Sequence, residues 1–172
     1  VKILCQYGAD THLENNYGTR PVTSAVIAAS RRGWDALSEL LAHQAGQPDL
    51  SDFPMIAGAV IGTSGQAILR LLEARADLNE RYTPSLTDPI GVAFWIKGKF
   101  YRPGGPSILA RMGYHHHRAT PLMAAIICGN FDVAARLISE GADLDLKNSK
   151  GKTALDFALE GGAPDYILEG LE

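Results

Sequence analysis

The sequence predicts an all-α protein in which pairs of helices stack side by side into a linear solenoid. Two series of short phrases lead to this prediction. Apolar runs with helical spacing end repeatedly in a phrase centred on glycine, and phrases that suit helix starts recur between these ends. Both series repeat at a similar interval along the 172 residues, which is typical of a repeat architecture.

The predicted helix ends share a residue that suits the left-handed conformation after an apolar run. Glycine adopts this conformation without steric cost and closes a helix there. In one copy, Arg75 stands in the place of glycine. The five copies are Tyr7-Gly8-Ala9-Asp10, Gln44-Ala45-Gly46, Ala74-Arg75-Ala76-Asp77, Arg111-Met112-Gly113-Tyr114 and Glu140-Gly141-Ala142-Asp143.

The predicted helix starts contain proline in four of five copies, and proline suits the first helical turn because its missing N–H is not needed there. A small residue follows four positions later in every copy, which lets a neighbouring helix approach closely. The starts are Arg20-Pro21-Val22, Phe53-Pro54-Met55, Asp88-Pro89-Ile90, Thr120-Pro121-Leu122 and Thr153-Ala154-Leu155. The small residues are Ala25, Gly58, Ala93, Ala125 and Ala158.

The spacing of these phrases predicts alternating long and short units. The steps between successive helix ends are 38, 29, 38 and 28 residues, with a mean of about 33. Pro21 and Pro89 are 68 residues apart, and Pro54 and Pro121 are 67 residues apart. We therefore expect a duplicated two-unit module, in which the long connections have room for a projecting β-hairpin.

This phrasing resembles the ankyrin repeat family. The best copy runs from Ala119 to Ala125, with Thr120-Pro121-Leu122 at its centre, and closes at Gly141-Ala142-Asp143-Leu144. The histidine usual after Thr-Pro-Leu is absent from every copy. The resemblance implies an ankyrin-repeat solenoid of helix–turn–helix pairs with short β-hairpin-like loops. It also implies that a partner protein binds along the hairpin tips and the concave face of the first helices.

The repeat phrases predict a single domain composed of several units. Its first residue is Val1, not methionine, so we expect a fragment of a longer protein. The predicted units are an N-terminal half repeat at 1–16, repeats at 17–50, 51–80, 81–118 and 119–148, and a C-terminal capping repeat at 149–172.

Composition disfavours several classes of protein. A net charge of −3 and a pI of about 5.9 disfavour nucleic-acid binding, which needs a basic surface. The longest uncharged apolar stretch, Phe53 to Leu69, is 17 residues long and too polar to span a bilayer. The first residues show no basic and apolar pattern that would argue for export, and Cys5 and Cys128 have no CxxC partner. We expect a cytoplasmic or nuclear protein with buried, reduced thiols and no membrane partner.

Two segments invite a chemical interpretation. His115-His116-His117 has no further ligand at metal spacing, so exposed or helix-capping histidines are favoured over a metal site or catalysis. The segment from Gly98 to Pro106 lacks the order of a phosphate-binding loop and reads as a connection between helices. No catalytic motif is present. We therefore expect no enzyme activity, no metal and no cofactor.

The remaining candidates are surface residues that would contact another protein or peptide. Trp95 and Ile127, beside Lys97, would suit an amphipathic or acidic peptide, unless both pack between repeats. The candidate hairpin-tip residues are Asn16, Tyr17, Thr19, Lys150 and Lys152. The candidate concave-face residues are Arg31, Arg32, Trp95, Lys97 and Ile127.

Two alternatives belong to other functional classes. One is an enzyme or small-molecule-binding protein with a pocket walled by 94–118, where Tyr101, Arg102 and His115 lie. The other is an architectural repeat segment of a larger multidomain protein. The sequence names neither the partner nor the oligomeric state.

Overall fold

The computed structural model describes residues 1–16, 19–29, 34–44, 54–62, 65–84 and 89–172. Within these residues the regular structure is entirely helical, as predicted. None of the helices there has the length and apolar character needed to cross a membrane. The helices are α1 (Lys2–Gln6), α2 (Pro21–Ala29), α3 (Trp34–His43), α4 (Pro54–Ile61), α5 (Gly65–Glu73), α6 (Pro89–Gly98), α7 (Ile108–His115), α8 (Pro121–Cys128), α9 (Phe131–Ser139), α10 (Ala154–Gly161) and α11 (Asp165–Leu171).

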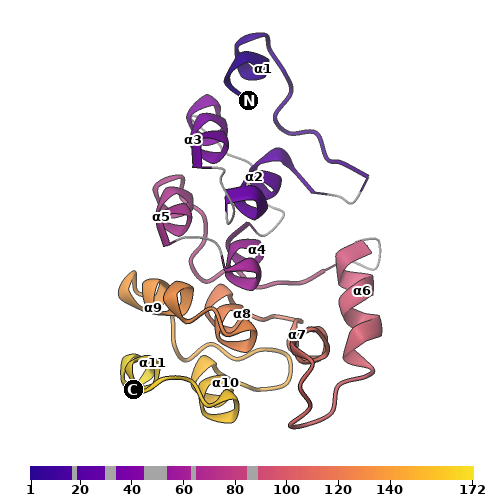
Figure 1. The fold of residues 1–172 in the computed structure, drawn as a ribbon, viewed down its shortest axis with the longest axis vertical. Coiled ribbons are helices and arrows are strands. Elements are labelled where there is room, and N and C mark those ends of the chain that lie inside the picture. The colour runs from indigo at the N-terminus through magenta and orange to yellow at the C-terminus, as the bar shows by residue number, and fades with distance from the viewer. Residues whose placement is uncertain (17–18, 30–33, 45–53, 63–64, 85–88) are drawn as a thin grey trace.

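Within the described ranges, four helical pairs form the stack. Helices α2, α4, α8 and α10 follow one another in the layer of first helices, and α3, α5, α9 and α11 follow one another in the layer of second helices (Figure 1). The short helix α1 continues the second layer against α3. Because each pair contacts only its neighbours, one elongated core runs the length of the stack.

The predicted helix starts are confirmed. Helices α2, α4, α6 and α8 begin at the four predicted prolines, and α10 begins at Ala154. The Thr120 hydroxyl accepts a hydrogen bond from Met123 N at 3.3 Å. Thr153 and Asp156 form a reciprocal capping box, in which two otherwise unpaired helix N–H groups find partners.

Small residues explain how closely the first helices pack. Ala25, Ala125 and Ala158 are 6%, 0% and 0% exposed, and Gly58 is also buried. Ala93, the fifth member of this predicted series, is exposed. Its helix, α6, is the first helix that does not belong to the stack.

The predicted repeat at 81–118 is not an in-line member of the stack. Helix α4 packs directly on α8, and α5 packs on α9, so the pairs on either side of α6 and α7 touch each other. Asp143 N donates to Asn79 Oδ1 at 2.9 Å, and Asn130 Nδ2 donates to Ala59 O at 2.7 Å. These hydrogen bonds join the units before and after 81–118 directly.

Helices α6 and α7 are instead inserted at the tip of a hairpin. Tyr82 and Ala119 are joined by a 3.0 Å hydrogen bond from Tyr82 N to Ala119 O. The corresponding bond in the last hairpin runs from Asn148 N to Lys152 O at 3.0 Å. Arg118 has a φ of 59° and takes the place of Gly151, whose φ is 75°. Residues 83–117, which we call the insertion, therefore replace the two tip residues Ser149 and Lys150 of that hairpin.

This placement explains why the spacing of the sequence phrases predicts an in-line repeat at 81–118 that the structure does not contain. The insertion adds nearly one repeat length, so it keeps the apparent period while leaving the stack. The predicted two-unit duplication is consequently wrong. Gly113 is not a helix cap, because α7 continues past it to His115. By contrast, Gly8, Arg75 and Gly141 have the positive φ values expected of helix ends, and Gly46 lies outside the described residues.

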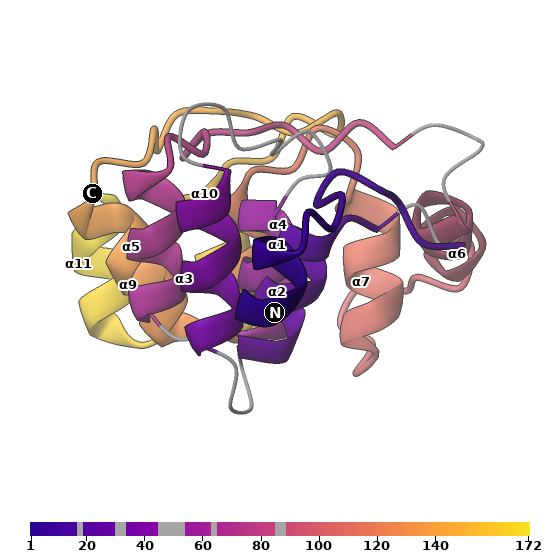
Figure 2. The ribbon, with the colours of Figure 1, turned by 90° about the horizontal axis from the view of Figure 1, so that it is seen from above.

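The insertion forms a third layer beside the first helices. Figure 2 shows the second helices on one side, the first helices in the middle, and α7 and then α6 on the far side. Helix α7 packs on α8, whereas α6 packs on α7 and runs along the stack, across the direction of the other helices (Figures 1 and 2). The two cysteines are free, with Cys5 buried and Cys128 half-buried.

Candidate functional site

Helices α6 and α7 cross at two glycines, and this crossing positions the insertion. A Cβ atom at Gly113 would lie 2.5 Å from Phe94 O, and one at Gly98 would lie 2.5 Å from Gly113 O. No larger residue fits at either position without moving backbone atoms, so the two glycines let α6 and α7 cross in contact. Ser107 caps the start of α7 by accepting from Ala110 N at 3.2 Å.

The outer surface of α6 is apolar and uncovered. Helix α6 is apolar around most of its circumference, a pattern typical of a helix buried on all sides. Within the part of the chain that the structure describes, however, only α7 and its surroundings cover it. Trp95 is 56% exposed, Ile96 is 46% exposed, and Phe100, just beyond the helix, is 72% exposed. Clustered exposed apolar residues of this kind mark interaction surfaces.

The same segment is strongly basic. Residues 89–118 contain five of the 16 Lys and Arg residues and none of the 19 Asp and Glu residues. Lys97 and Lys99 are exposed beside the apolar residues. The Lys99 Nζ atom lies 3.7 Å from the centre of the Trp95 ring, in a cation–π contact. The insertion thus presents aromatic and cationic groups together.

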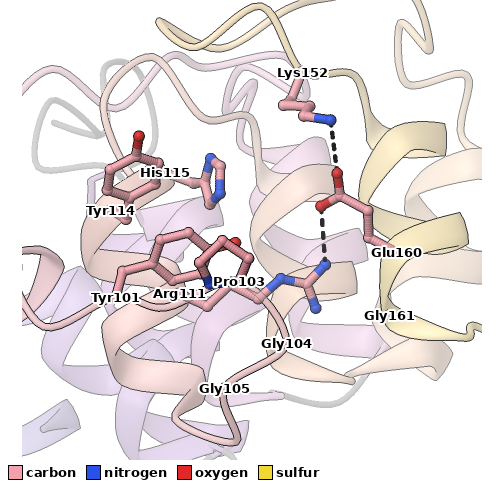
Figure 3. A pocket seen from close by; sticks show the side chains of 10 residues that line it. All are labelled: Tyr101, Pro103, Gly104, Gly105, Arg111, Tyr114, His115, Lys152, Glu160 and Gly161. Atoms are coloured by element: carbon pink, nitrogen blue, oxygen red, sulfur yellow. Dashed lines mark hydrogen bonds and ion pairs between the residues drawn. The ribbon is translucent and has the colours of Figure 1, made fainter.

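A pocket of about 670 Å³ lies between the insertion and the last helical pair (Figure 3). Tyr101 and Tyr114 stack with their ring centres 4.6 Å apart on one side of it. Lys152 Nζ lies 2.6 Å from Glu160 Oε1 on the other side. Pockets of this volume hold small organic ligands in other proteins.

Arg111 joins the two sides of this pocket. Its guanidinium donates to Phe157 O at 3.1 Å and lies 3.9 Å from Glu160 Oε2. Glu160 therefore shares one carboxylate between two cations. The hydrogen bond from Lys152 to Glu160 raises the pKa of Lys152 above its usual value, so this amine stays charged at neutral pH.

His115 is buried at the pocket wall, and its imidazole has no hydrogen-bond partner among the described residues. The residue is 4% exposed. Its ring packs edge to face against Tyr101, Tyr114 and Phe157. Burial lowers the pKa of His115 to about 4, so the ring is neutral at pH 7. An unpaired buried polar group of this kind costs about 1–3 kcal/mol.

The predicted hairpin-tip residues lie at two separate hairpins. Asn16 and Lys150 are exposed, and Thr19 and Lys152 are half-buried. Lys150 Nζ lies 4.6 Å from the centre of the Tyr114 ring, which brings the last hairpin tip against the insertion. Tyr17, like Arg31 and Arg32 of the predicted concave face, lies outside the described residues.

The predicted stripe of Trp95 and Ile127 does not exist on the surface. Trp95 and Lys97 are exposed on α6, whereas Ile127 is 3% exposed. Ile127 belongs to α8, which is enclosed by α4, α7, α9 and α10 and buries seven consecutive residues. Of the two predicted interpretations, packing between repeats holds for Ile127, and exposure holds for Trp95.

The three consecutive histidines have three different environments. His116 follows α7 as its C-cap, and its Nδ1 lies 2.6 Å from Gly113 O. His117 is exposed. These two fit the expectation of capping or exposed histidines, but the buried His115 does not. No group of three or more metal-ligating side chains occurs within the described ranges. The predicted connection from Gly98 to Pro106 does link α6 to α7.

Sequence reasoning missed Ile96 and Phe100 on the apolar surface, and Arg111 and Glu160 in the pocket. Two signals pointed to the insertion: the absence of acidic residues from 89–118, and a helix that is apolar nearly all round. No local sequence pattern predicts the contact between Glu160 and Arg111, because the two residues lie in different layers of the fold.

Comparisons with known proteins identify the repeats. A sequence model of the family described as ankyrin repeats (many copies) matches residues 114–158. Palmitoyltransferase ZDHHC13 of Mus musculus is 43% identical over 44 residues, which cover 26% of this chain and 7% of that protein. The Homo sapiens protein of the same name gives the same values. Palmitoyltransferase ZDHHC17 of Homo sapiens is 36% identical over 52 residues, 30% of this chain and 8% of that protein.

The matched stretch spans less than a tenth of each of these relatives. The match to the family model, at 114–158, begins in α7 and continues through α8, α9 and most of α10. Residues 114–158 therefore match the ankyrin repeat family that the phrasing predicted, and the four helical pairs stack as a helical repeat solenoid.

Proposed function

We propose that this chain is a non-catalytic module that binds an acidic, amphipathic segment of another protein through the outer surface of α6. Ankyrin repeats in general mediate protein–protein interaction, and the chain carries them. The observation that supports this particular surface is the exposure of Trp95, Ile96 and Phe100 beside Lys97 and Lys99.

The apolar residues would supply most of the binding free energy. Aromatic side chains that become buried at an interface are frequent energetic anchors, and their truncation typically costs about 2 kcal/mol or more. Trp95 and Phe100 together offer two such anchors at one end of α6. A stack of four pairs would hold this surface in a fixed orientation, because α7 attaches the insertion to α8.

The charges favour an acidic partner. Lys97 and Lys99 lie in the segment without acidic residues, so no carboxylate of that segment competes with those of a partner. Opposite charges across an interface speed association and exclude wrong partners more than they add affinity. Binding through this surface is consequently expected to be faster at low salt than at high salt.

Affinity capture from the native cell, followed by titration of each captured protein, tests this proposal. The variant Trp95→Ser/Phe100→Ser should bind a captured partner about 30-fold more weakly than the unaltered chain. The matched control is Leu159→Ser/Tyr166→Ser, which removes two exposed apolar side chains from the last helical pair.

The charge variant Lys97→Glu/Lys99→Glu completes the test, and it should slow association most at low salt. Equal affinity of the α6 variant and the unaltered chain would contradict the proposal. Equal losses in the α6 variant and in the control would also contradict it, because the loss would then not be specific to α6.

The architectural alternative remains a prediction. The enzyme or small-molecule alternative gains a pocket at the predicted place. We propose that this pocket acts by binding a small molecule.

A further inference from the structure

The pocket between the insertion and α10 has features that the protein-binding function does not use. It lies below the last hairpin, and its walls come from the loop after α6, from α7 and from α10 (Figure 3). None of the exposed residues of α6 lines it. We propose that this pocket binds a small aromatic anion, a planar ring that carries a carboxylate or phosphate group, with His115 as a hydrogen-bond partner.

The unpaired histidine points to a missing ligand. His115 is more than nine-tenths buried, and both of its ring nitrogens lack partners within the described part of the chain. Figure 3 shows the nitrogen-bearing edge of the imidazole facing the side where Lys152 and Glu160 lie. Buried polar groups are nearly always hydrogen-bonded in folded proteins, so an exception at a pocket wall calls for a partner.

The charges define the polar part of the ligand. Arg111 and Lys152 face the pocket, and the carboxylate of Glu160 is shared between them. Lys150 adds a further cation at the Tyr114 ring. The lining therefore carries more positive than negative charge, and an anionic group would complete the pairing of Arg111 and Lys152.

A neutral His115 suits the role of hydrogen-bond partner to the ligand. Burial lowers the pKa of His115 to about 4, and its neighbours Arg111, Lys150 and Lys152 lower it as well, against the opposing effect of Glu160. A neutral imidazole has one donor and one acceptor nitrogen, so it can donate one hydrogen bond to an anionic oxygen.

The aromatic wall defines the apolar part of the ligand. Tyr101 and Tyr114 stack at 19° between their ring planes and form a flat side to the pocket. Pro103, Gly104 and Gly105 continue the lining, and the two glycines leave room because they carry no side chains. A flat apolar wall opposite a cationic one suits a ring that carries its charge at one end.

Binding of benzoate and phenyl phosphate, followed by NMR of the intact chain with labelled histidine and tyrosine rings, tests this proposal. Acetate, inorganic phosphate and benzyl alcohol serve as probes that carry only the charge or only the ring. We expect at least one aromatic anion to shift the His115 and Tyr101 ring signals, and to bind about tenfold or more tightly than the probes that carry half of its features. The preference between benzoate and phenyl phosphate identifies the charged group.

Two variants assign the site, each with a matched control on the same segment. His115→Phe keeps an aromatic ring but removes both nitrogens, and His117→Phe alters the exposed neighbour. Lys152→Met removes a cation of the pocket, and Lys147→Met removes an exposed cation of the same hairpin. We expect about tenfold weaker binding in His115→Phe and in Lys152→Met, and unchanged binding in the two controls.

Three results would overturn the proposal. They are no ring shift with either aromatic anion, equal binding of the half-featured probes, or unchanged binding in both pocket variants. Lys152→Met keeps the test decisive if His115→Phe does not fold. None of these three results bears on the protein-binding proposal, because Trp95 and Phe100 lie outside the pocket.

Discussion

At the scale of single residues, His115 couples folding to pH. In the folded chain burial lowers its pKa from the ordinary value of 6.5 to about 4. Above pH 6.5 the imidazole is neutral in both the folded and the unfolded state, so it adds no pH dependence. Between pH 6.5 and pH 4 the unfolded state takes up a proton that the folded state does not, and stability therefore falls as the pH falls.

The expected loss from His115 between pH 7 and pH 5 is about 2 kcal/mol in the free energy of unfolding. Urea denaturation of the unaltered chain and of His115→Phe at both pH values measures it. Because the other titrating groups are common to both proteins, the difference between the two losses isolates His115. An identical loss in both proteins would contradict the assignment of a buried, neutral imidazole.

Arg118 is a second residue whose conformation has a measurable cost. Its φ of 59° is in the left-handed region, which costs a side-chain-bearing residue about 1 kcal/mol relative to glycine. The corresponding position in the last hairpin is Gly151. We expect Arg118→Gly to raise the free energy of unfolding by about 1 kcal/mol.

The reverse change, Gly151→Ala, is expected to lower stability by a similar amount, since no atom within 4 Å would hinder the new Cβ and only the backbone conformation is strained. Thermal or urea unfolding of both variants provides the comparison. If Arg118→Gly were neutral or destabilising, the hairpin geometry assigned to the ends of the insertion would be wrong.

At the scale of elements, the crossing of α6 and α7 depends on Gly113. A Cβ at this position would meet the backbone of Phe94 at 2.5 Å and of Gly98 at 2.8 Å. Backbone atoms cannot yield as a flexible side chain can, so Gly113→Ala should force the helices apart at a cost of about 1–3 kcal/mol. This cost exceeds the roughly 1 kcal/mol that alanine gains over glycine inside a helix.

The matched control for Gly113→Ala is Gly65→Ala in α5, where the nearest atom to the new Cβ would be an Arg136 side-chain carbon at 3.8 Å. We expect this control to leave stability unchanged or to raise it. Urea unfolding followed by tryptophan fluorescence, with Trp34 replaced by Phe so that Trp95 alone reports, detects separation of the two helices. Equal effects of the two substitutions would contradict the close crossing.

At the scale of the whole molecule, local signals predicted the helices and not the order of their stacking. Thr120-Pro121 and Thr153 mark helix starts through the chemistry of the first turn, which depends on a few neighbouring residues. The stacking of α4 on α8 depends on contacts between distant segments, such as Asn130 with Ala59. An insertion of nearly one repeat length hides this arrangement because it preserves the period.

The candidate site was predictable only in part, for the same reason. Trp95 and Lys97 are predicted on the concave face of the first helices, and both are exposed, but they lie on α6, outside the layer of first helices. The burial of Ile127 and of His115 follows from the placement of α7 against α8 and beside α10, which no local pattern encodes. The repeat pattern predicts that Ala93 is buried against a neighbouring helix, but Ala93 is exposed.

The direct contact between the units on either side of the insertion is the central claim, and chemical cross-linking measures it most directly. The variant Asn79→Cys/Asp143→Cys, in a background with Cys5→Ala and Cys128→Ala, places a thiol on each side of the 2.9 Å hydrogen bond that joins these units. Mild oxidation should join the two thiols in a disulfide within the intact, folded chain, because a disulfide forms only between Cα atoms less than about 7 Å apart. If α6 and α7 formed an in-line repeat, a helical layer of about 8–10 Å would separate the thiols and no link would form.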